Sequence, residues 1–240
     1  MKFTELLKNK SADNFGNPSP LIAFLGDSVT QGCFEIYRDG ELLRTVFDSP
    51  NGYAEKTKSI LNMMYPETAV SMLNAGINGG TVKNALTRLD RDVLVHRPDL
   101  VVVCFGLNDA NDEVEGLREY SENLKTLFKR IKDSGTEIVF MTPNMMNTYT
   151  DCNVTDPVAV MLAEMFSEKQ KNGYFDSFID SAREICREEG IPVADCYAIW
   201  KQMNECGVNT TRLLSNRLNH PTRDMHWLFA WEIVKTILKN

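Results

Sequence analysis

The sequence predicts an α/β fold in which a parallel sheet is covered by helices on both faces. Five short apolar runs recur along the 240 residues. Continuous apolar runs of this length are typical of strands that are buried on both faces. Longer segments with helix-like spacing separate them, and such alternation favours right-handed crossovers between parallel strands. At 43% hydrophobic residues, the chain can bury one sizeable core.

The predicted elements alternate along the chain. Strands are expected at 21–26, 69–74, 100–106, 137–142 and 191–196. Helices are expected at 52–64, 81–95, 113–133 and 157–189, and an amphipathic tail at about 222–239 closes the chain. Glycine and proline support two boundaries, because both residues stop helices: Ser134-Gly135 precedes the fourth strand and Gly190-Ile191-Pro192 precedes the fifth.

Two segments fit no core element. Residues 1–20 are charged and polar and lack the apolar stretch of a signal peptide, so we expect an N-terminal extension of one domain that spans 1–240. Residues 34–50 contain Asp39-Gly40, a pair that favours a tight hairpin turn. We expect a surface hairpin here, or an excursion near the entrance of a site.

Charge and composition narrow the classes of partner. The net charge is −7 and the isoelectric point about 5.1, which disfavours nucleic acid and anionic membranes because both bind basic surfaces. No apolar stretch is long enough to span a membrane. The six cysteines are scattered, without the spacing of a zinc site, so we expect reduced thiols and no metal. Because we find neither a signal peptide nor a membrane span, we expect a cytoplasmic protein. Nothing in the sequence indicates the oligomeric state.

Residues suited to catalysis follow the first three predicted strands, at the strand ends where parallel sheets bind their ligands. Ser28 lies in a strand-to-helix turn, where its hydroxyl could act as a nucleophile. The loop 74–81 holds three glycines that allow close approach of the backbone. Asn108 carries two amide donors that could stabilise an oxyanion. Each of these features alone is also typical of a helix cap or a flexible turn.

Two aspartates near Asn108 fit the plainer interpretation. Asp109 and Asp112 stand where a carboxylate caps or turns the chain into the next helix. We therefore assign neither of them to catalysis.

One of the three histidines is placed to act as a general base. His96 precedes the third strand, at the amino end of the sheet, and His226 lies inside the C-terminal helix. His220 lies in the loop before that helix, from where it can reach over the strand ends to Ser28. Because the base must be neutral, activity is expected to fall below about pH 6.5, the ordinary imidazole value.

Together these loops resemble those of the GDSL, or SGNH, hydrolase family. Gly26-Asp27-Ser28 is similar to its first block, residues 74–81 to its second, residues 106–109 to its third and His220-Pro221 to its last. The four blocks occur in the family's order, from about residue 21 to the end. The resemblance implies a flavodoxin-like three-layer α/β/α sandwich with a central parallel five-stranded sheet, and no cofactor.

The resemblance also implies ester hydrolysis through an acyl-enzyme. Ser28 would attack the ester, and His220 would take its proton and return it to the leaving alcohol. The backbone N–H groups of Ser28 and Gly79 and the side chain of Asn108 would hold the oxyanion. The implied substrates are small-molecule or carbohydrate esters, with O-acetyl groups on sugars as the first expectation.

One position departs from the family pattern. The family usually places Asp three residues before the catalytic histidine, and Arg217 stands there. A guanidinium cannot accept the imidazole N–H. Asn216 could accept it through its amide oxygen, and a backbone carbonyl or Asp224 are the other candidates. The sequence therefore predicts a Ser-His dyad whose third member stays open.

Other interpretations remain open. Glycine-rich turns that lead into helices also suit a non-catalytic module that binds a sugar or a phosphate. An enzyme of the same fold could also act on thioesters or transfer the acyl group. Residues 143–156 are expected to border the site, and Met145-Met146 could line an acyl pocket or only fill the core.

Overall fold

The computed structural model describes residues 2–111 and 116–240 and contains a five-stranded parallel sheet in the order β4-β1-β5-β6-β7. Each strand pairs in parallel with its neighbour. The strands are β1 (Leu21–Gly26), β4 (Ser71–Gly76), β5 (Leu100–Cys104), β6 (Glu137–Met141) and β7 (Val193–Ala194). The predicted parallel five-stranded sheet is therefore confirmed.

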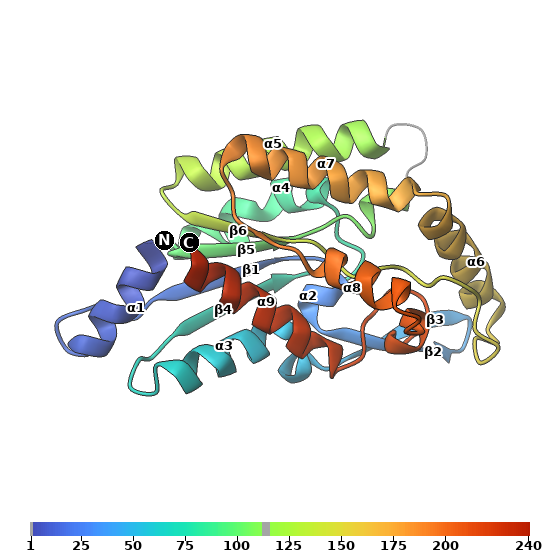
Figure 1. Cartoon of the computed structure of the whole chain (residues 1–240), viewed down its shortest axis with the longest axis horizontal. Coiled ribbons are helices and arrows are strands. Elements are labelled where there is room, and N and C mark those ends of the chain that lie inside the picture. Colours follow the sequence, from blue (N-terminus) through green and yellow to red (C-terminus); the bar gives the residue numbers. More distant parts are fainter. Residues whose placement is uncertain (1, 112–115) are drawn as a thin grey trace.

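Helices cover both faces of this sheet (Figure 1). One layer holds α4 (Val82–Asp92), α5 (Gly116–Asp133) and α7 (Tyr174–Glu189), and the other holds α3 (Tyr53–Met64) and α9 (Met225–Lys239). Each of these helices buries apolar side chains in the core, as the spacing of hydrophobic residues predicts. The three-layer α/β/α arrangement expected from the sequence is confirmed.

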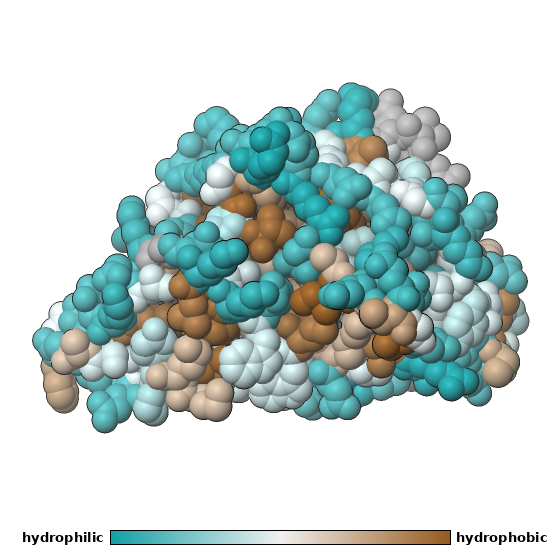
Figure 2. All heavy atoms as spheres, in the orientation of Figure 1, coloured by the Kyte–Doolittle hydropathy of each residue, from teal (hydrophilic) through white to brown (hydrophobic). Residues whose placement is uncertain are grey.

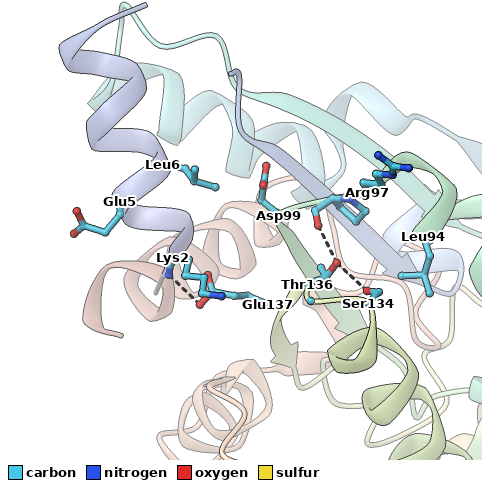
Figure 3. Close-up of a pocket in the computed structure, with 11 residues that line it drawn as sticks. Lys2, Glu5, Leu6, Leu94, Arg97, Asp99, Ser134, Thr136 and Glu137 are labelled. Carbon is cyan, nitrogen blue, oxygen red and sulfur yellow. Dashed lines mark hydrogen bonds between the residues drawn. The ribbon is translucent and has the colours of Figure 1, made fainter. Parts of the chain in front are cut away.

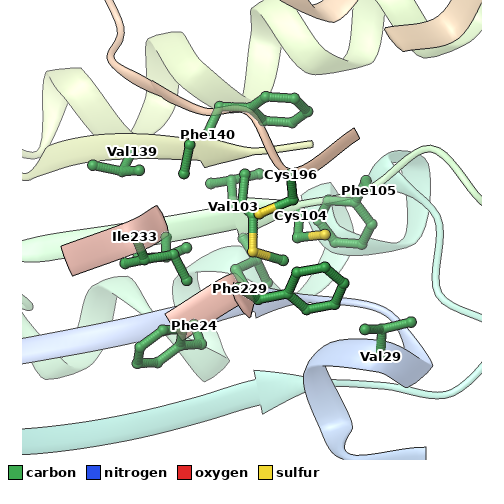
Figure 4. Close-up of a cluster of buried hydrophobic side chains, with 14 of the residues drawn as sticks. Phe24, Val29, Val103, Cys104, Phe105, Val139, Phe140, Cys196, Phe229 and Ile233 are labelled. Carbon is green, nitrogen blue, oxygen red and sulfur yellow. The ribbon is translucent and has the colours of Figure 1, made fainter. Parts of the chain in front are cut away.

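The core lies between the sheet and these helices (Figure 4). Every residue of β5 is buried, as expected for a central strand. On one face, Phe24 and Val103 of the sheet lie near Phe229 and Ile233 of α9. All four side chains are fully buried, and each such burial is worth about 1.5–3 kcal/mol.

Some boundaries differ from those that the sequence predicts. The second sheet strand starts at Ser71 rather than residue 69, and the last strand shrinks to Val193–Ala194. The last strand is short because the Asp195 side chain accepts the N–H of Ala198 and so starts an unpredicted helix, α8 (Cys196–Glu205). The helix predicted from residue 113 is described only from Gly116, so residues 113–115, like Asp112, lie outside the described residues.

The long helix predicted over 157–189 is two helices. The first, α6, spans Pro157–Lys171, and α7 begins at Tyr174. Between them, Gly173 has a φ of 78°, a left-handed conformation that ends a helix and that glycine adopts without strain.

A helix that the sequence analysis did not predict lies within residues 1–20. In α1 (Lys2–Ala12), Phe3 and Leu7 share one face, and both are fully buried. The Glu137 carboxylate at the start of β6 accepts the backbone N–H groups of Lys2 and Phe3 at 2.9 and 2.8 Å. This contact satisfies N–H groups that the first turn of a helix leaves without a partner.

Residues 34–50 do contain the predicted hairpin. Its strands β2 (Cys33–Asp39) and β3 (Leu42–Phe47) pair in antiparallel fashion around a turn at Gly40. Arg38 joins the hairpin to Asp156, at the start of α6, by an ion pair at 2.5 Å. The hairpin lies beside the end of the sheet where α6 and α8 also lie (Figure 1).

The 3-10 helices span Ser49–Asn51, Leu94–His96, Asp109–Asn111 and Thr210–Leu213. Within residues 2–111 and 116–240, no helix has the length and apolar character needed to cross a membrane. Figure 2 shows hydrophilic side chains over much of one face, with hydrophobic residues gathered in separate patches.

Candidate active site

Ser28 stands at the carboxyl end of β1, as the first residue of the short helix α2 (Ser28–Gln31). The preceding Asp27 caps this turn, because its Oδ1 accepts the N–H of Val29 at 2.9 Å. A glycine is needed behind the turn: a Cβ on Gly76 would lie 2.3 Å from the backbone nitrogen of Gln31. These constraints hold the Ser28 side chain at the strand end.

The structure brings Ser28 and His220 together from distant parts of the chain. The Ser28 Oγ lies 3.0 Å from His220 Nε2, and His220 Nδ1 lies 2.9 Å from the carbonyl oxygen of Phe34. A carbonyl can only accept, so Nδ1 carries the proton and donates it. Nε2 is then unprotonated and faces the serine hydroxyl, which is the arrangement a general base requires.

Burial keeps the His220 ring neutral. The side chain is only 5% exposed, and this burial lowers its pKa to about 4, because a charged imidazolium would lose its hydration. The hydrogen bond to the Phe34 carbonyl and the charge of Glu35 act in the opposite direction, but they are smaller effects. At neutral pH the ring is therefore ready to accept a proton.

Asn216 does not orient the imidazole, which corrects the first candidate from the sequence. Its Oδ1 instead accepts three backbone N–H groups, from Leu218, Asn219 and His220, at 2.9–3.0 Å. The partner of Nδ1 is the Phe34 carbonyl, so the backbone alternative describes the structure. Asn216 shapes the loop that carries His220.

The other two residues considered beside His220 make different contacts. Arg217 has a φ of 60°, and its guanidinium donates to the backbone carbonyls of Arg212 and Leu214. Asp224 precedes α9 and makes no side-chain cap there. Neither residue is hydrogen-bonded to Nδ1.

The glycine-rich second loop, residues 74–81, lies next to α2. Asn74 donates from Nδ2 to the Thr30 carbonyl at 2.8 Å, and Gln31 Oε1 accepts the N–H of Asn78 at 2.7 Å. Gly79 is exposed and has a φ of 74°, a conformation that glycine adopts readily. The second loop is thus held against the turn that carries the serine.

Asn108 and Asp109 join the third loop to the second. Asn108 donates one of its two amide N–H groups to the Gly80 carbonyl at 3.0 Å. The Asp109 carboxylate accepts the N–H of Val82, the first residue of α4, and that of Gly106. The Asp109 carboxylate thus contacts the start of α4, an earlier helix, and not the start of the next helix, where the sequence placed its capping role. Burial raises the pKa of this carboxyl to about 6.

Neither of the other two histidines is hydrogen-bonded to the serine hydroxyl, which contacts His220. His96 lies in the 3-10 helix before β5, at the amino end of the sheet. His226 is fully buried in α9, and its Nδ1 accepts the backbone N–H of Tyr53 at 2.9 Å. In the part of the chain that the structure describes, no cluster of three His, Cys, Asp or Glu residues could hold a metal ion.

Two cavities lie at opposite ends of the sheet. A cavity of about 710 Å³ is formed by α1 and the segments that precede β5 and β6, with Arg97, Asp99 and Thr136 among its lining residues (Figure 3). It lies at the amino ends of the strands, away from Ser28. A cavity of about 560 Å³ lies between the hairpin, the segment 153–156 and the segment 215–217, which directly precedes the His220 loop.

The segment after β6 only partly borders the site. Residues 153–156 line the cavity beside the hairpin, as expected. Met145 and Met146 are buried in the hydrophobic core, and the Met146 N–H donates to Gln170 Oε1. The methionines therefore fill the core, which was the plainer of the two interpretations.

The loops of this site lie within the match to a known protein family. The sequence model of the GDSL-like lipase/acylhydrolase family matches residues 24–228, which include the loops of Ser28, Gly79, Asn108 and His220. The chain belongs to this family. The match extends over most of the chain, and it spans four of the five strands of the sheet from end to end.

Individual relatives match only part of this chain. An acetylxylan esterase from Geobacillus stearothermophilus is 30% identical over 146 residues, which are 57% of this chain and 64% of that protein. An arylesterase from Vibrio mimicus is 36% identical over 91 residues, 34% of this chain and 42% of that protein. The chain thus spans less than two thirds of each of these relatives.

Solved structures of other proteins share this fold over most of their length. The crystal structure of an acetylxylan esterase from Geobacillus stearothermophilus matches with a TM-score of 0.67 at 24% identity, over 91% of this chain and 94% of that one. An alpha/beta hydrolase from the metagenome of Lake Arreo matches with a TM-score of 0.66 at 21% identity, over 90% and 94%. At these identities the likeness shows the fold alone.

The sequence analysis missed two features of this site. It gave no reason to single out Phe34, whose carbonyl contacts His220, because every residue carries a carbonyl. It also passed over Arg223, which binds Glu35 and Asp48 of the hairpin segment. The only available signal was the position of Arg223 three residues after His220.

Proposed function

We propose that this protein is a serine esterase in which Ser28 and His220 act as a dyad. The observation that carries the proposal is the 3.0 Å contact between Ser28 Oγ and an unprotonated His220 Nε2. In the first step, Oγ attacks the acyl carbon while its proton moves to Nε2. The protonated imidazole then gives this proton to the leaving alcohol, and an acyl-serine forms.

Water completes the reaction by the same route. His220 takes a proton from water, the hydroxide attacks the acyl-serine, and the proton returns to Ser28 Oγ as the acid leaves. The imidazolium that forms in each half-reaction is buried, so it depends on its Nδ1–H contact with the Phe34 carbonyl. In the proposed dyad, the Phe34 backbone carbonyl takes the place of the carboxylate that completes a catalytic triad.

The oxyanion of each tetrahedral intermediate needs hydrogen-bond donors. We assign this role to the backbone N–H groups of Ser28 and Gly79 and to the side chain of Asn108. Asn108 supports the assignment because its amide is fixed by the Gly80 carbonyl, next to Gly79. Donors that are fixed before the reaction need no reorganisation when charge develops on the oxygen.

The proposed substrates are acetyl esters of carbohydrates. The relatives support this class, since they include an acetylxylan esterase and an arylesterase. The cavity beside the hairpin supports it as well, because polar side chains such as Asn153 and Ser215 line it together with the half-exposed Tyr37. Ser215 Oγ also donates to the His220 carbonyl at 3.1 Å, so this cavity adjoins the proposed base. The alcohol part of the ester would lie there.

A fluorophosphonate probe tests the proposal, because it labels only an activated serine. We expect labelling of the wild type at Ser28, mapped by peptide mass spectrometry, and its loss in Ser28→Ala and His220→Ala. Ser59→Ala, on the exposed face of α3, is the matched control and should label like the wild type. A folded wild type that takes up no label would contradict the esterase and favour a binding module.

Hydrolysis assays then define the substrate. p-Nitrophenyl esters of increasing acyl length, with acetylated xylooligosaccharides beside them, should show the highest kcat/KM for acetyl groups. A preference for thioesters, or acyl transfer to added alcohols in place of hydrolysis, would favour the related activities that the fold also supports.

A further inference from the structure

A second set of contacts involves the residues around Phe34, whose backbone carbonyl accepts the His220 Nδ1–H. Arg223 Nη1 and Nη2 donate to the two carboxylate oxygens of Glu35 at 2.6 and 3.1 Å. Its Nε donates to Asp48 Oδ2 at 2.6 Å. Glu35 follows Phe34 on β2, and Asp48 directly follows β3. The Arg223 side chain therefore joins the base of both hairpin strands to the segment that carries His220.

The Phe34 side chain is held by the same arginine. The Arg223 guanidinium carbon lies 4.3 Å from the centre of the Phe34 ring, within the range of a cation–π contact. The His226 ring lies 4.9 Å from the Phe34 ring, which is fully buried. The side chain of Phe34 and its neighbour in sequence are thus both fixed relative to Arg223.

The local backbone explains why Phe34 has a carbonyl available to His220. The register of the hairpin shifts between Cys33 and Ile36, so Phe34 and Glu35 together face a single residue of β3. A bulge of this kind interrupts the ladder of hydrogen bonds and redirects the backbone, and bulges often lie beside active sites. A carbonyl in a bulge lacks the regular ladder that would hold it, so its position depends on other contacts.

Arg223 is suited to supply those contacts. A guanidinium binds a carboxylate through two parallel hydrogen bonds, which fixes its orientation as well as its distance. The hydrogen bonds from Arg223 also lower the pKa of Glu35 and of Asp48, so both carboxylates stay charged at neutral pH. The three-residue arrangement is therefore maintained across the range in which the dyad would work.

We propose that Arg223 is a positioning residue for His220: by fixing Glu35 and the Phe34 ring, it sets the carbonyl that orients Nδ1–H. The proposal rests on the esterase function proposed above. In the usual family pattern an aspartate before the histidine orients it directly; here the Phe34 carbonyl does so, and an arginine after the histidine holds that carbonyl in place. Arg223 acts through Phe34 and touches no reacting atom.

Kinetics of Arg223→Gln test the proposal. We expect kcat for p-nitrophenyl acetate to fall about 10-fold or more while KM changes little, since a displacement of about 1 Å in a catalytic group can cost about 100-fold. Glu35→Gln should lower kcat in the same direction, and Arg223→Lys should retain part of it. The matched control is Arg44→Gln, which removes an ion pair with Asp39 near the hairpin turn and should keep the wild-type kcat.

A spectroscopic measurement separates positioning from general loosening of the fold. In the wild type, the His220 Nδ1–H proton should give a low-field NMR signal that exchanges slowly, because it is buried and hydrogen-bonded. That signal should broaden or vanish in folded Arg223→Gln and persist in Arg44→Gln. Thermal unfolding shows which variants are folded, and Glu35→Gln carries the test if Arg223→Gln is not.

The outcomes distinguish this proposal from the esterase itself. If folded Arg223 and Glu35 variants keep both kcat and the Nδ1–H signal, Arg223 has no positioning role, although the esterase stands. If the wild type takes up no fluorophosphonate, the esterase fails, and the NMR comparison still decides whether Arg223 fixes the ring.

Discussion

At the residue scale, the burial of His220 changes the expected pH dependence. The base works only when neutral, and its pKa is lowered to about 4. Activity should therefore be lost as the pH falls through about 4, not through the ordinary value of about 6.5. The check is kcat/KM for p-nitrophenyl acetate between pH 3.5 and 8, with circular dichroism to confirm folding. A half-loss near pH 6.5 would show that the ring is hydrated in solution.

Asn108 allows a second prediction at this scale. Asn108→Ala removes a proposed oxyanion donor, so kcat should fall by about 100- to 1000-fold, or about 2.7–4 kcal/mol. Asn108→Asp keeps the shape but replaces the donors with a negative charge, and it should be at least as damaging. Steady-state kinetics with p-nitrophenyl acetate measure both variants. Wild-type kcat in either folded variant would remove Asn108 from the proposed mechanism.

Side-chain chemistry decided how much of the site could be predicted from the sequence. Ser28, Asn108 and His220 carry reactive groups after strand ends or in a late loop, so their types and order indicated them. The Phe34 carbonyl gave no such signal, and its use depends on a bulge that only the pairing of β2 with β3 reveals. Asn216 was a reasonable acceptor by type, but the folded loop uses its oxygen for three backbone N–H groups.

At the scale of elements, α1 makes a testable contribution to stability. Phe3 is fully buried against the rest of the molecule, whereas Phe15, just beyond the same helix, is fully exposed. Phe3→Ala should therefore lower the free energy of unfolding by about 3–5 kcal/mol, the usual cost of emptying a buried aromatic site. Phe15→Ala is the matched control and should change it little. Urea unfolding measures both, and equal midpoints would mean that α1 is not docked in solution.

The elements whose bounds the sequence misplaced differ from prediction for identifiable physical reasons. Apolar runs locate strands, because burial on both faces selects such residues, but they do not say where pairing stops. The run 191–196 loses most of its length because Asp195 caps α8. The break between α6 and α7 had a signal in Asn172-Gly173, but helical spacing continues on both sides of it and hid the turn.

At the scale of the whole molecule, four buried groups govern how stability depends on pH between about 5 and 6. Folding lowers the pKa of two of them and raises the pKa of the other two. Burial lowers the pKa of His220 to about 4 and that of His226 to about 3, so near pH 5.5 the unfolded chain binds more protons at these sites. Their contribution to stability falls as the pH drops below about 6.5. Burial raises the pKa of Asp27 to about 7 and that of Asp109 to about 6, so there the folded chain binds more protons.

Between pH 5 and pH 6, the extra protons bound by the two histidines in the unfolded chain should nearly equal those bound by the two aspartates in the folded chain. The free energy of unfolding should therefore change little with pH there. Asp27→Asn would remove one side of the balance with little change of shape, since Asp27 Oδ2 has no hydrogen-bond partner among the described residues. Stability of this variant should then rise with pH by about 1.4 kcal/mol per unit, the slope for one uncompensated proton. Urea unfolding at pH 5.0, 5.5 and 6.0 measures the slopes, with Glu67→Gln, on the surface, as the control that should follow the wild type. Parallel curves for the wild type and Asp27→Asn would mean that Asp27 is ionised in the folded protein, and that the turn carrying Ser28 accommodates a buried charge.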